Sequence, residues 1–170
     1  TTVTSSDVDG GAAVYSIAGG ADAGLFTINA STGALTFVAA PDFEAPTDSG
    51  TNNVYDVTVQ VADGNGGTDT QAIAVTVTNV NEAPVITSNG GGATASVSAA
   101  ENQSAATTIT SSDVDGGTAV YSIAGGADAA LFTVNAATGV LTFNTAPDFE
   151  APADAGADNV YDVTVQVSDG

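Results

Sequence analysis

Residues 54–78 read VYDVTVQVADGNGGTDTQAIAVTVT, and this stretch decides the fold. Valine alternates with a polar residue along 57–61, and an apolar residue again occupies every second position of 73–77. A period of two is typical of β-strands that bury one face. The residues between the two runs, 63–67, are Asp-Gly-Asn-Gly-Gly, which is the composition of a hairpin turn. The stretch therefore predicts two antiparallel strands joined by a short loop.

The same pattern returns because the chain repeats itself at an offset of 106 residues. Thr1–Gly64 overlays Thr107–Gly170 with about 50 of 64 positions identical. We expect two modules, residues 1–84 as a repeat that lacks its first strand and residues 85–170 as a repeat that lacks its last strand. Flanking repeats or identical subunits are expected to supply the missing strands.

Further short strands are separated by Gly, Asn, Asp and Pro, and no stretch has the periodicity of an amphipathic helix. They are predicted at Ala93–Val97, Ala105–Ser111, Ala119–Ile123, Leu131–Val134 and Val140–Phe143. About seven short strands per repeat predict an all-β chain of tandem Greek-key β-sandwiches with immunoglobulin-like architecture. The expected core of the first repeat is Tyr15, Leu25, Phe26, Leu35, Phe37 and Tyr55, with their counterparts in the second.

The composition excludes several partners. The chain has 20 acidic residues and no Lys, Arg, His or Cys, so it cannot form a side-chain salt bridge, a disulfide or a thiolate metal site. Nucleic acids and anionic membrane surfaces attract basic side chains, so neither is an expected partner. No apolar run is long enough to span a membrane. Cations are the partners that this charge favours.

Acidic residues gather in short motifs that suit a hard cation. Asp113-Val114-Asp115-Gly116-Gly117 sets two carboxylates two residues apart beside glycines, and Asp7-Val8-Asp9 repeats the pattern. Pro147–Pro152 reads PDFEAP, as does Pro41–Pro46, and Asn79–Pro84 reads NVNEAP between the repeats. Calcium takes six to eight oxygen ligands from carboxylates, amides and carbonyls, which such turns can provide.

With these motifs in this order, the chain resembles tandem cadherin repeats, specifically the bacterial cadherin-like modules of giant surface adhesins or extracellular filaments. The resemblance implies calcium sites where consecutive modules meet. For the junction inside this chain it implies ligands from the first module and from the second, namely Asp42, Glu44, Asn81, Glu82, Asp113, Asp115 and Asp169. For the next junction it implies Glu101, Asp148 and Glu150, and for the preceding one Asp7, Asp9 and Asp63.

The remaining aspartates match no shared motif, so we expect them to be solvated surface groups. They are Asp22, Asp48, Asp56, Asp69, Asp128, Asp154, Asp158 and Asp162.

The resemblance and the acidic motifs together favour an extracellular or cell-surface structural repeat in which calcium stiffens the module junctions. A glycosidase would also use paired carboxylates, but the acidic pairs occur in both copies rather than in one site, so no enzyme is expected. Two alternatives remain open. One is a glycan-binding module, and the other is a subunit that polymerises by strand exchange.

Overall fold

The computed structural model describes residues 1–169, and the chain divides into two compact units, Thr1–Val80 and Asn81–Gly170. Both are built of antiparallel strands, and the helical segments within the described residues are single 3-10 turns. This confirms the predicted all-β class. Each unit is described by itself below.

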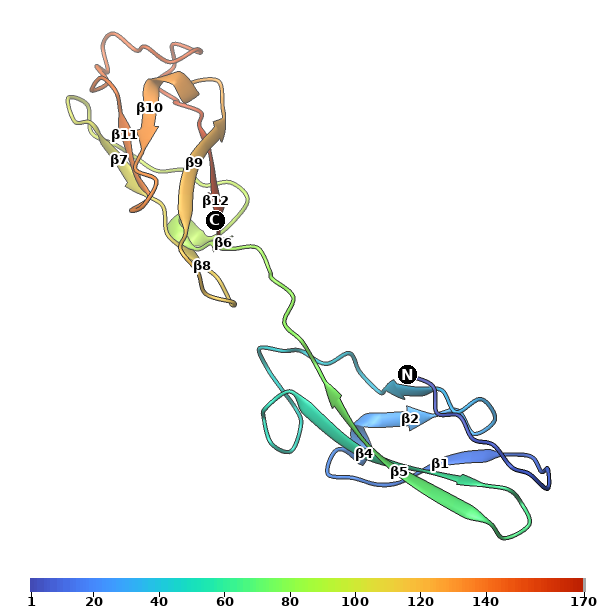
Figure 1. Cartoon of the computed structure of the whole chain (residues 1–170). Helices are drawn as coiled ribbons and strands as arrows, with labels where there is room; N and C mark the ends of the chain where they lie inside the picture. Colours follow the sequence, from blue (N-terminus) through green and yellow to red (C-terminus); the bar gives the residue numbers. More distant parts are fainter. Residues whose placement is uncertain (170) are drawn as a thin grey trace. The chain divides into compact units, whose positions relative to one another are not determined.

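The first unit contains two antiparallel sheets (Figure 1). Its elements are β1 (Val14–Gly19), η1 (Ala23–Leu25), β2 (Phe26–Ile28), β3 (Leu35–Phe37), β4 (Val54–Ala62) and β5 (Thr68–Thr76). One sheet has the order β1-β4-β5 and the other is the pair β2-β3. The predicted hairpin is confirmed as β4 and β5, which pair in unbroken register from Val54 opposite Thr76 to Ala62 opposite Thr68.

The second unit has the counterparts of β1 to β4 as β9 to β12 and adds three strands before them. Its elements are β6 (Val85–Ile86), η2 (Ser88–Gly90), β7 (Ala105–Thr108), β8 (Ser111–Ser112), β9 (Val120–Gly125), η3 (Ala129–Leu131), β10 (Phe132–Val134), β11 (Val140–Phe143) and β12 (Thr164–Ser168). The sheets are β10-β11-β7, β12-β9 and β6-β8. The strand predicted at Ala93–Val97 is wrong, since residues 93–99 form no strand and are exposed. Apart from Val97 they are only Ala, Ser and Thr, which offer little apolar surface to bury.

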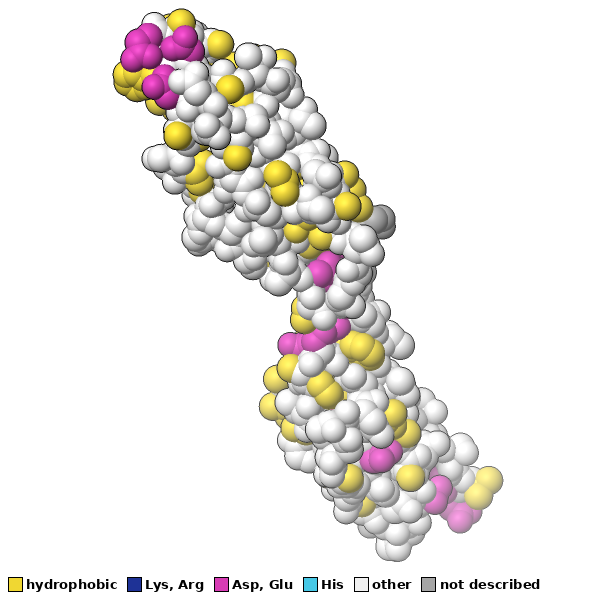
Figure 2. Space-filling model, turned by 90° about the vertical axis from the view of Figure 1, so that its left-hand side faces the viewer, with side chains coloured by type: hydrophobic (Ala, Val, Ile, Leu, Met, Phe, Trp, Pro, Cys, Tyr) yellow, Lys and Arg dark blue, Asp and Glu magenta, His cyan; other side chains and the backbone are white. Residues whose placement is uncertain are grey.

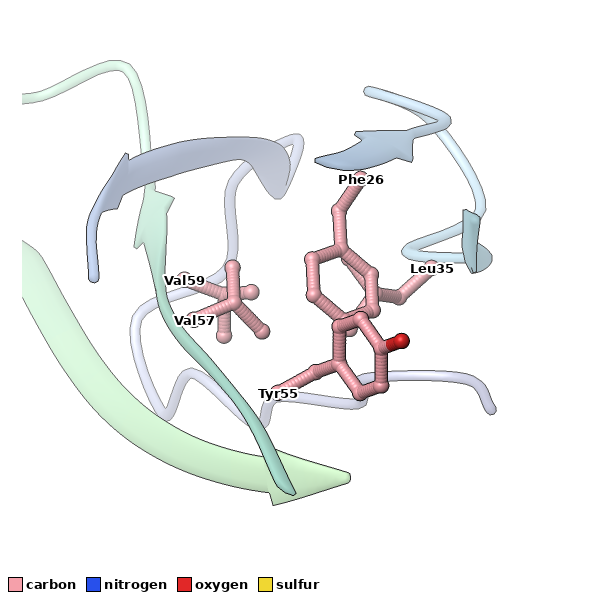
Figure 3. Packing of buried hydrophobic residues seen from close by; sticks show 5 residues of the cluster. All are labelled: Phe26, Leu35, Tyr55, Val57 and Val59. Atoms are coloured by element: carbon pink, nitrogen blue, oxygen red, sulfur yellow. The ribbon is translucent and has the colours of Figure 1, made fainter. Parts of the chain in front are cut away.

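The core of the first unit lies between its two sheets. Figure 3 shows Phe26 and Leu35 meeting Tyr55, Val57 and Val59 from β4. The rings of Phe26 and Phe37 stack at 4.5 Å between centroids, and Tyr55 meets Phe37 edge-on at 5.1 Å. Edge-to-face pairs of this kind add about 1 kcal/mol each to the burial of apolar area.

Most of the predicted core is confirmed. Tyr15, Phe26, Leu35 and Tyr55 are buried, while Leu25 and Phe37 are half-buried and pack against them. The sequence placed Val57 and Val59 on one face of a strand but not in the core, and each is only 1% exposed. They are covered because β4 has a neighbour on both sides, β1 and β5.

Four aspartates expected at the surface are buried, so that prediction is wrong for them. They are Asp22, Asp48, Asp128 and Asp154, each 6% exposed or less. Backbone N–H groups of a loop point at each carboxylate. Asp48, for example, accepts hydrogen bonds from Gly50, Asn52 and Asn53, all at 3.0 Å. These donors replace the water that a buried carboxylate loses. Asp56, Asp69, Asp158 and Asp162 are exposed as expected.

These hydrogen bonds also set the acidity of the loop carboxylates. Burial raises the pKa of Asp48, but the N–H donors of Asn52, Asn53 and Gly50 together outweigh it and hold the pKa below 3.8. For Asp154 the N–H group of Asp158 is the largest cause of a lowered pKa. A carboxyl with a lowered folded-state pKa stabilises the fold above its unfolded pKa, and this stabilisation is lost as the pH falls through the folded-state pKa.

We therefore expect Asp48→Asn to make the free energy of unfolding of the first unit less dependent on pH. Urea unfolding from pH 7 to pH 2 measures this, and the stability gap between wild type and variant should close below pH 3.8. Acidification also weakens the repulsion between carboxylates, but it does so in both proteins. This effect therefore cancels when the stability of the variant is subtracted from that of the wild type. A gap that is constant over the whole range would contradict the expectation.

Candidate metal centres

The second unit brings five predicted ligands together. Asn81 Nδ2 donates to Asp169 Oδ2 at 2.5 Å, and the Glu82 N–H group donates to Asp115 Oδ2 at 2.6 Å. The Asp115 N–H group in turn donates to Asp113 Oδ1 at 3.0 Å. Residues from three distant parts of the chain therefore form one connected group, which we call the Asp113 cluster: Asn81, Glu82, Asp113, Asp115 and Asp169.

Short strands hold this cluster in place. β6 pairs with β8 so that Val85 lies opposite Ser112, which sets the residues before Val85 beside those after Ser112. Asp169 directly follows β12, where Ser168 lies opposite Val120 of β9. The second turn glycine, Gly117, lies beside Asp169, since a Cβ placed on it would be in van der Waals contact with the Asp169 carbonyl oxygen at 3.8 Å. The Asp113 cluster is thus a product of sheet pairing.

The donor set of the Asp113 cluster fits calcium. Asp113 Oδ2 is buried and has no hydrogen-bond partner in the part of the chain that the structure describes. A buried carboxylate oxygen without a donor is costly, and a cation would relieve that cost. No basic side chain can do so, because the chain has none. Four carboxylates and one amide offer only oxygen ligands to a cation, as calcium prefers.

A second group in this unit consists of Glu101, Asp148 and Glu150. One carboxylate oxygen from each lies within 4.8 Å of the others, and all three residues are exposed. Glu101 Oε2 accepts a hydrogen bond from Phe149 N–H at 3.2 Å, and Asp148 Oδ1 accepts one from Glu150 N–H at 3.0 Å. Figure 1 shows β8 and the C-terminus at one end of this unit and the orange-red loop after β11 at the other.

The first unit brings Asp7 and Asp63 together, whereas Asp9 is placed near them only through its backbone. Asp7 Oδ1 accepts the Asp9 N–H group at 2.9 Å. A Cβ at Gly11 would lie 2.8 Å from the Asp63 carbonyl oxygen and 3.5 Å from Asp7 Oδ2, so Asp7 and Asp63 flank this glycine. The cavity beside them measures about 280 Å³, and Asp69 of β5 also lines it. Asp69 is the second residue after the hairpin loop 63–67. This position close to Asp63 is the sequence signal that could have connected Asp69 with the Asp7 and Asp63 pair.

Asp42 and Glu44 lie on one turn of the first unit. Asp42 Oδ1 accepts N–H groups from Glu44 at 3.0 Å and from Ala45 at 3.2 Å. The turn is anchored by Asn53, whose side-chain amide donates to the Phe43 carbonyl at 2.9 Å. The meeting of this pair with the Asp113 cluster remains a prediction of the cadherin resemblance.

Charge on the surface is concentrated rather than spread. Figure 2 shows the acidic side chains of one face in separate magenta groups on a mostly white surface, with no basic side chain among them. Carboxylates grouped without counter-charge repel one another, and a divalent cation reverses the sign of that interaction. Within residues 1–169, no helix is long and apolar enough to cross a membrane.

Sequence comparison finds one matching family model and one curated relative. A family model described as bacterial Ig domain matches residues 1–76. Human protocadherin Fat 4 is 32% identical over 145 residues, which is 80% of this chain but 3% of that protein. The chain therefore spans only a small part of its curated relative.

Comparison with solved structures gives the same fold. Human protocadherin-24 EC1-2 superposes with a TM-score of 0.59 at 20% identity, covering 99% of this chain and 82% of that one. Mouse cadherin-23 EC22-24 superposes with a TM-score of 0.52 at 22% identity, covering 94% and 48% of the two chains. The chain has a cadherin-like, immunoglobulin-like β-sandwich fold. The matching families are non-enzymatic structural modules, which confirms that the chain is not an enzyme.

Proposed function

We propose that this chain is a pair of calcium-binding structural repeats from an extracellular or cell-surface bacterial protein, either an adhesin stalk or a filament. Its role is mechanical: calcium bound by the acidic groups ties consecutive repeats and stiffens the array. The similarity to bacterial Ig domains and to protocadherins supports a structural module of adhesion type.

The observation that carries the proposal is the Asp113 cluster. Its hydrogen bonds tie the Asp115 carboxylate to the Glu82 N–H group and the Asp113 carboxylate to the Asp115 N–H group, and Asp113 Oδ2 is buried without a donor. The internal repeat also supports the proposal. Asp7, Asp9 and Asp63 occupy the positions of the first repeat that are equivalent to Asp113, Asp115 and Asp169. The chain has no basic side chain to balance these carboxylates, and this favours a cation as their partner.

The mechanism follows from electrostatics. Without a cation the carboxylates repel one another and the connection between repeats loosens, whereas bridging calcium fixes it. Asp42 and Glu44 would supply ligands from the first repeat, and the Asp113 cluster would supply those from the second. Extracellular calcium modules bind with dissociation constants of about 10⁻⁴ to 10⁻³ M, so such sites fill outside the cell and empty in the cytosol.

We expect calcium to stabilise the second unit and Asp113→Asn to remove most of that effect. At about 100 times the dissociation constant, a ligand that binds only the folded state adds about 2.7 kcal/mol. Thermal unfolding and isothermal titration calorimetry of the intact chain, in calcium and in EDTA, measure the gain. X-ray scattering in the same buffers tests whether calcium makes the particle more rigid.

Asp162→Asn is the matched control, because Asp162 is exposed and lies outside every acidic group. It removes the same charge and should leave the calcium response unchanged. Equal melting temperatures with and without calcium would refute calcium binding. A calcium-dependent melting temperature with identical scattering profiles would instead refute the stiffening role alone.

A second candidate function, association by strand exchange, is favoured by an open cleft in the first unit. The cleft measures about 370 Å³ and lies between Phe26, Phe37 and β5. A strand from a neighbouring repeat or an identical subunit would fit it. Light scattering over a range of concentrations tests this, and a strictly monomeric chain would contradict it.

A further inference from the structure

The loop between β4 and β5 contains an Asn-Gly pair, Asn65–Gly66. The backbone nitrogen that follows an asparagine can attack the side-chain Cγ atom and close a five-membered succinimide ring. Glycine in the second position favours this step, because it has no side chain to block the approach and leaves the backbone free to rotate. The reaction needs no enzyme, so the structure of the loop decides its rate.

The loop leaves the reacting groups unhindered. Asn65 is exposed, and a Cβ placed on Gly64 or Gly66 would meet no other atom within 4 Å. The N–H groups of Asn65 and Gly67 donate to Asp63 Oδ1 at 2.7 and 2.9 Å. The N–H group of Gly66, which is the nucleophile, makes no hydrogen bond within residues 1–169, nor does the side-chain amide of Asn65.

The chain contains a second Asn-Gly pair, Asn89–Gly90, in a more constrained setting. Asn89 has a φ of 53° inside the turn η2, which Gly91 closes by donating to the Ser88 carbonyl at 3.0 Å. Its side-chain oxygen accepts a hydrogen bond from Thr107 Oγ1 at 3.3 Å. Ring closure requires the backbone and the side chain of the asparagine to rotate together, so this hydrogen bond must first break. Asn89 should therefore react more slowly.

We propose that Asn65 is a site of spontaneous deamidation. The Gly66 nitrogen forms a bond to Asn65 Cγ, and the side-chain nitrogen leaves as ammonia with the proton that Gly66 loses. Water then opens the ring at either carbonyl carbon, giving aspartate or isoaspartate at position 65. No oxidant, reductant or other reactant is consumed.

Both products change the loop. Each adds a negative charge next to Asp63, which no basic residue of the chain can compensate. Isoaspartate also inserts a methylene group into the main chain, inside the ring that Gly67 N–H closes onto Asp63 Oδ1. The Asp63 carboxylate then loses its fixed position. If the proposed calcium function holds, this modification weakens cation binding by Asp7, Asp9 and Asp63.

The test is ageing of the full chain at 37 °C and mildly alkaline pH in EDTA, followed by peptic digestion and mass spectrometry. We expect the Asn65 peptide to gain the mass of one deamidation several-fold faster than the Asn89 peptide, with isoaspartate as a product. In urea the two pairs should react at similar rates, which shows that any difference in the native chain comes from structure. Asn65→Gln, which cannot form the five-membered ring, should abolish the modification in that peptide.

Deamidation of Asn65 no faster than that of Asn89 in the native chain, with equal rates in urea, would overturn the proposal. Calorimetric titration of fresh and aged protein with calcium separates its two parts. If the aged protein carries isoaspartate but binds calcium as the fresh protein does, the modification site stands and its effect on the cation is refuted.

Discussion

Replacing Tyr55 with alanine is expected to destabilise the first unit by about 4 kcal/mol, which is within the range for removing a large aromatic side chain from a core. Tyr55 is 1% exposed and meets both Phe26 and Phe37 edge-on. Its removal leaves a closed cavity and deletes two aromatic contacts at once. Hydrogen exchange followed by peptic digestion and mass spectrometry resolves the two units within one chain and measures the loss.

The repeat supplies a matched control in Tyr161→Ala. Tyr161 makes the same ring contacts, at 6.4 Å to Phe132 and 5.1 Å to Phe143, but it is only half-buried and lines a cleft of about 510 Å³. Water can enter the space that this substitution opens, so the cavity cost is smaller. Tyr55→Phe should cost less than 1 kcal/mol, because it loses only a long hydrogen bond from Thr47 N–H. Equal losses for the two alanine variants would contradict the idea that the deeper burial of Tyr55 increases its contribution to stability.

Asp22→Ala should destabilise the first unit by about 3 kcal/mol, although an alanine would normally suit a protein interior better than a carboxylate. Asp22 is 4% exposed, and its two oxygens accept N–H groups from Ser49 and Asp56, each at 2.7 Å. Alanine leaves both donors without a partner and frees the loop from β4. The gain from removing one negative charge is smaller than the cost of leaving two buried N–H donors without a partner.

Asp56→Ala is the control for this variant. It removes the same charge from an exposed side chain while keeping the backbone donor, so its effect should stay within about 0.5 kcal/mol. Asp128→Ala should reproduce the loss in the second unit, where Asp128 accepts N–H groups from Ala155 at 2.7 Å and Asp162 at 2.8 Å. A neutral Asp22→Ala variant in urea unfolding would show that these carboxylates are not structural.

These buried aspartates divide the acidic residues of the chain into two kinds. Asp22, Asp48 and their counterparts are satisfied by backbone donors, so they need no cation. Asp113 differs, because one of its oxygens is buried without a donor in the described part of the chain. The buried oxygen without a donor therefore distinguishes Asp113 from the structural carboxylates Asp22 and Asp48.

The sequence by itself determined the β-architecture and the grouping of the acidic motifs. The alternation in 54–78 predicted β4 and β5, because a strand that buries one face must place an apolar residue at every second position. The repeat showed that one fold is used twice. Asp7, Asp63 and Asp113 each belong to a short turn motif of Asp and Gly, and such motifs can be recognised from the local sequence.

Only the tertiary structure decided which carboxylates are buried and which valines form the core. Asp22 looks like an ordinary turn residue, and its carboxylate depends on the N–H group of Ser49, 27 residues further along the chain. The alternation in 57–61 marks Val57, Val59 and Val61 alike, but Val57 and Val59 are 1% exposed whereas Val61 is half-buried. The burial of a residue depends on the segments that pack against it. Those segments are distant in the sequence, so the local sequence pattern does not reveal them.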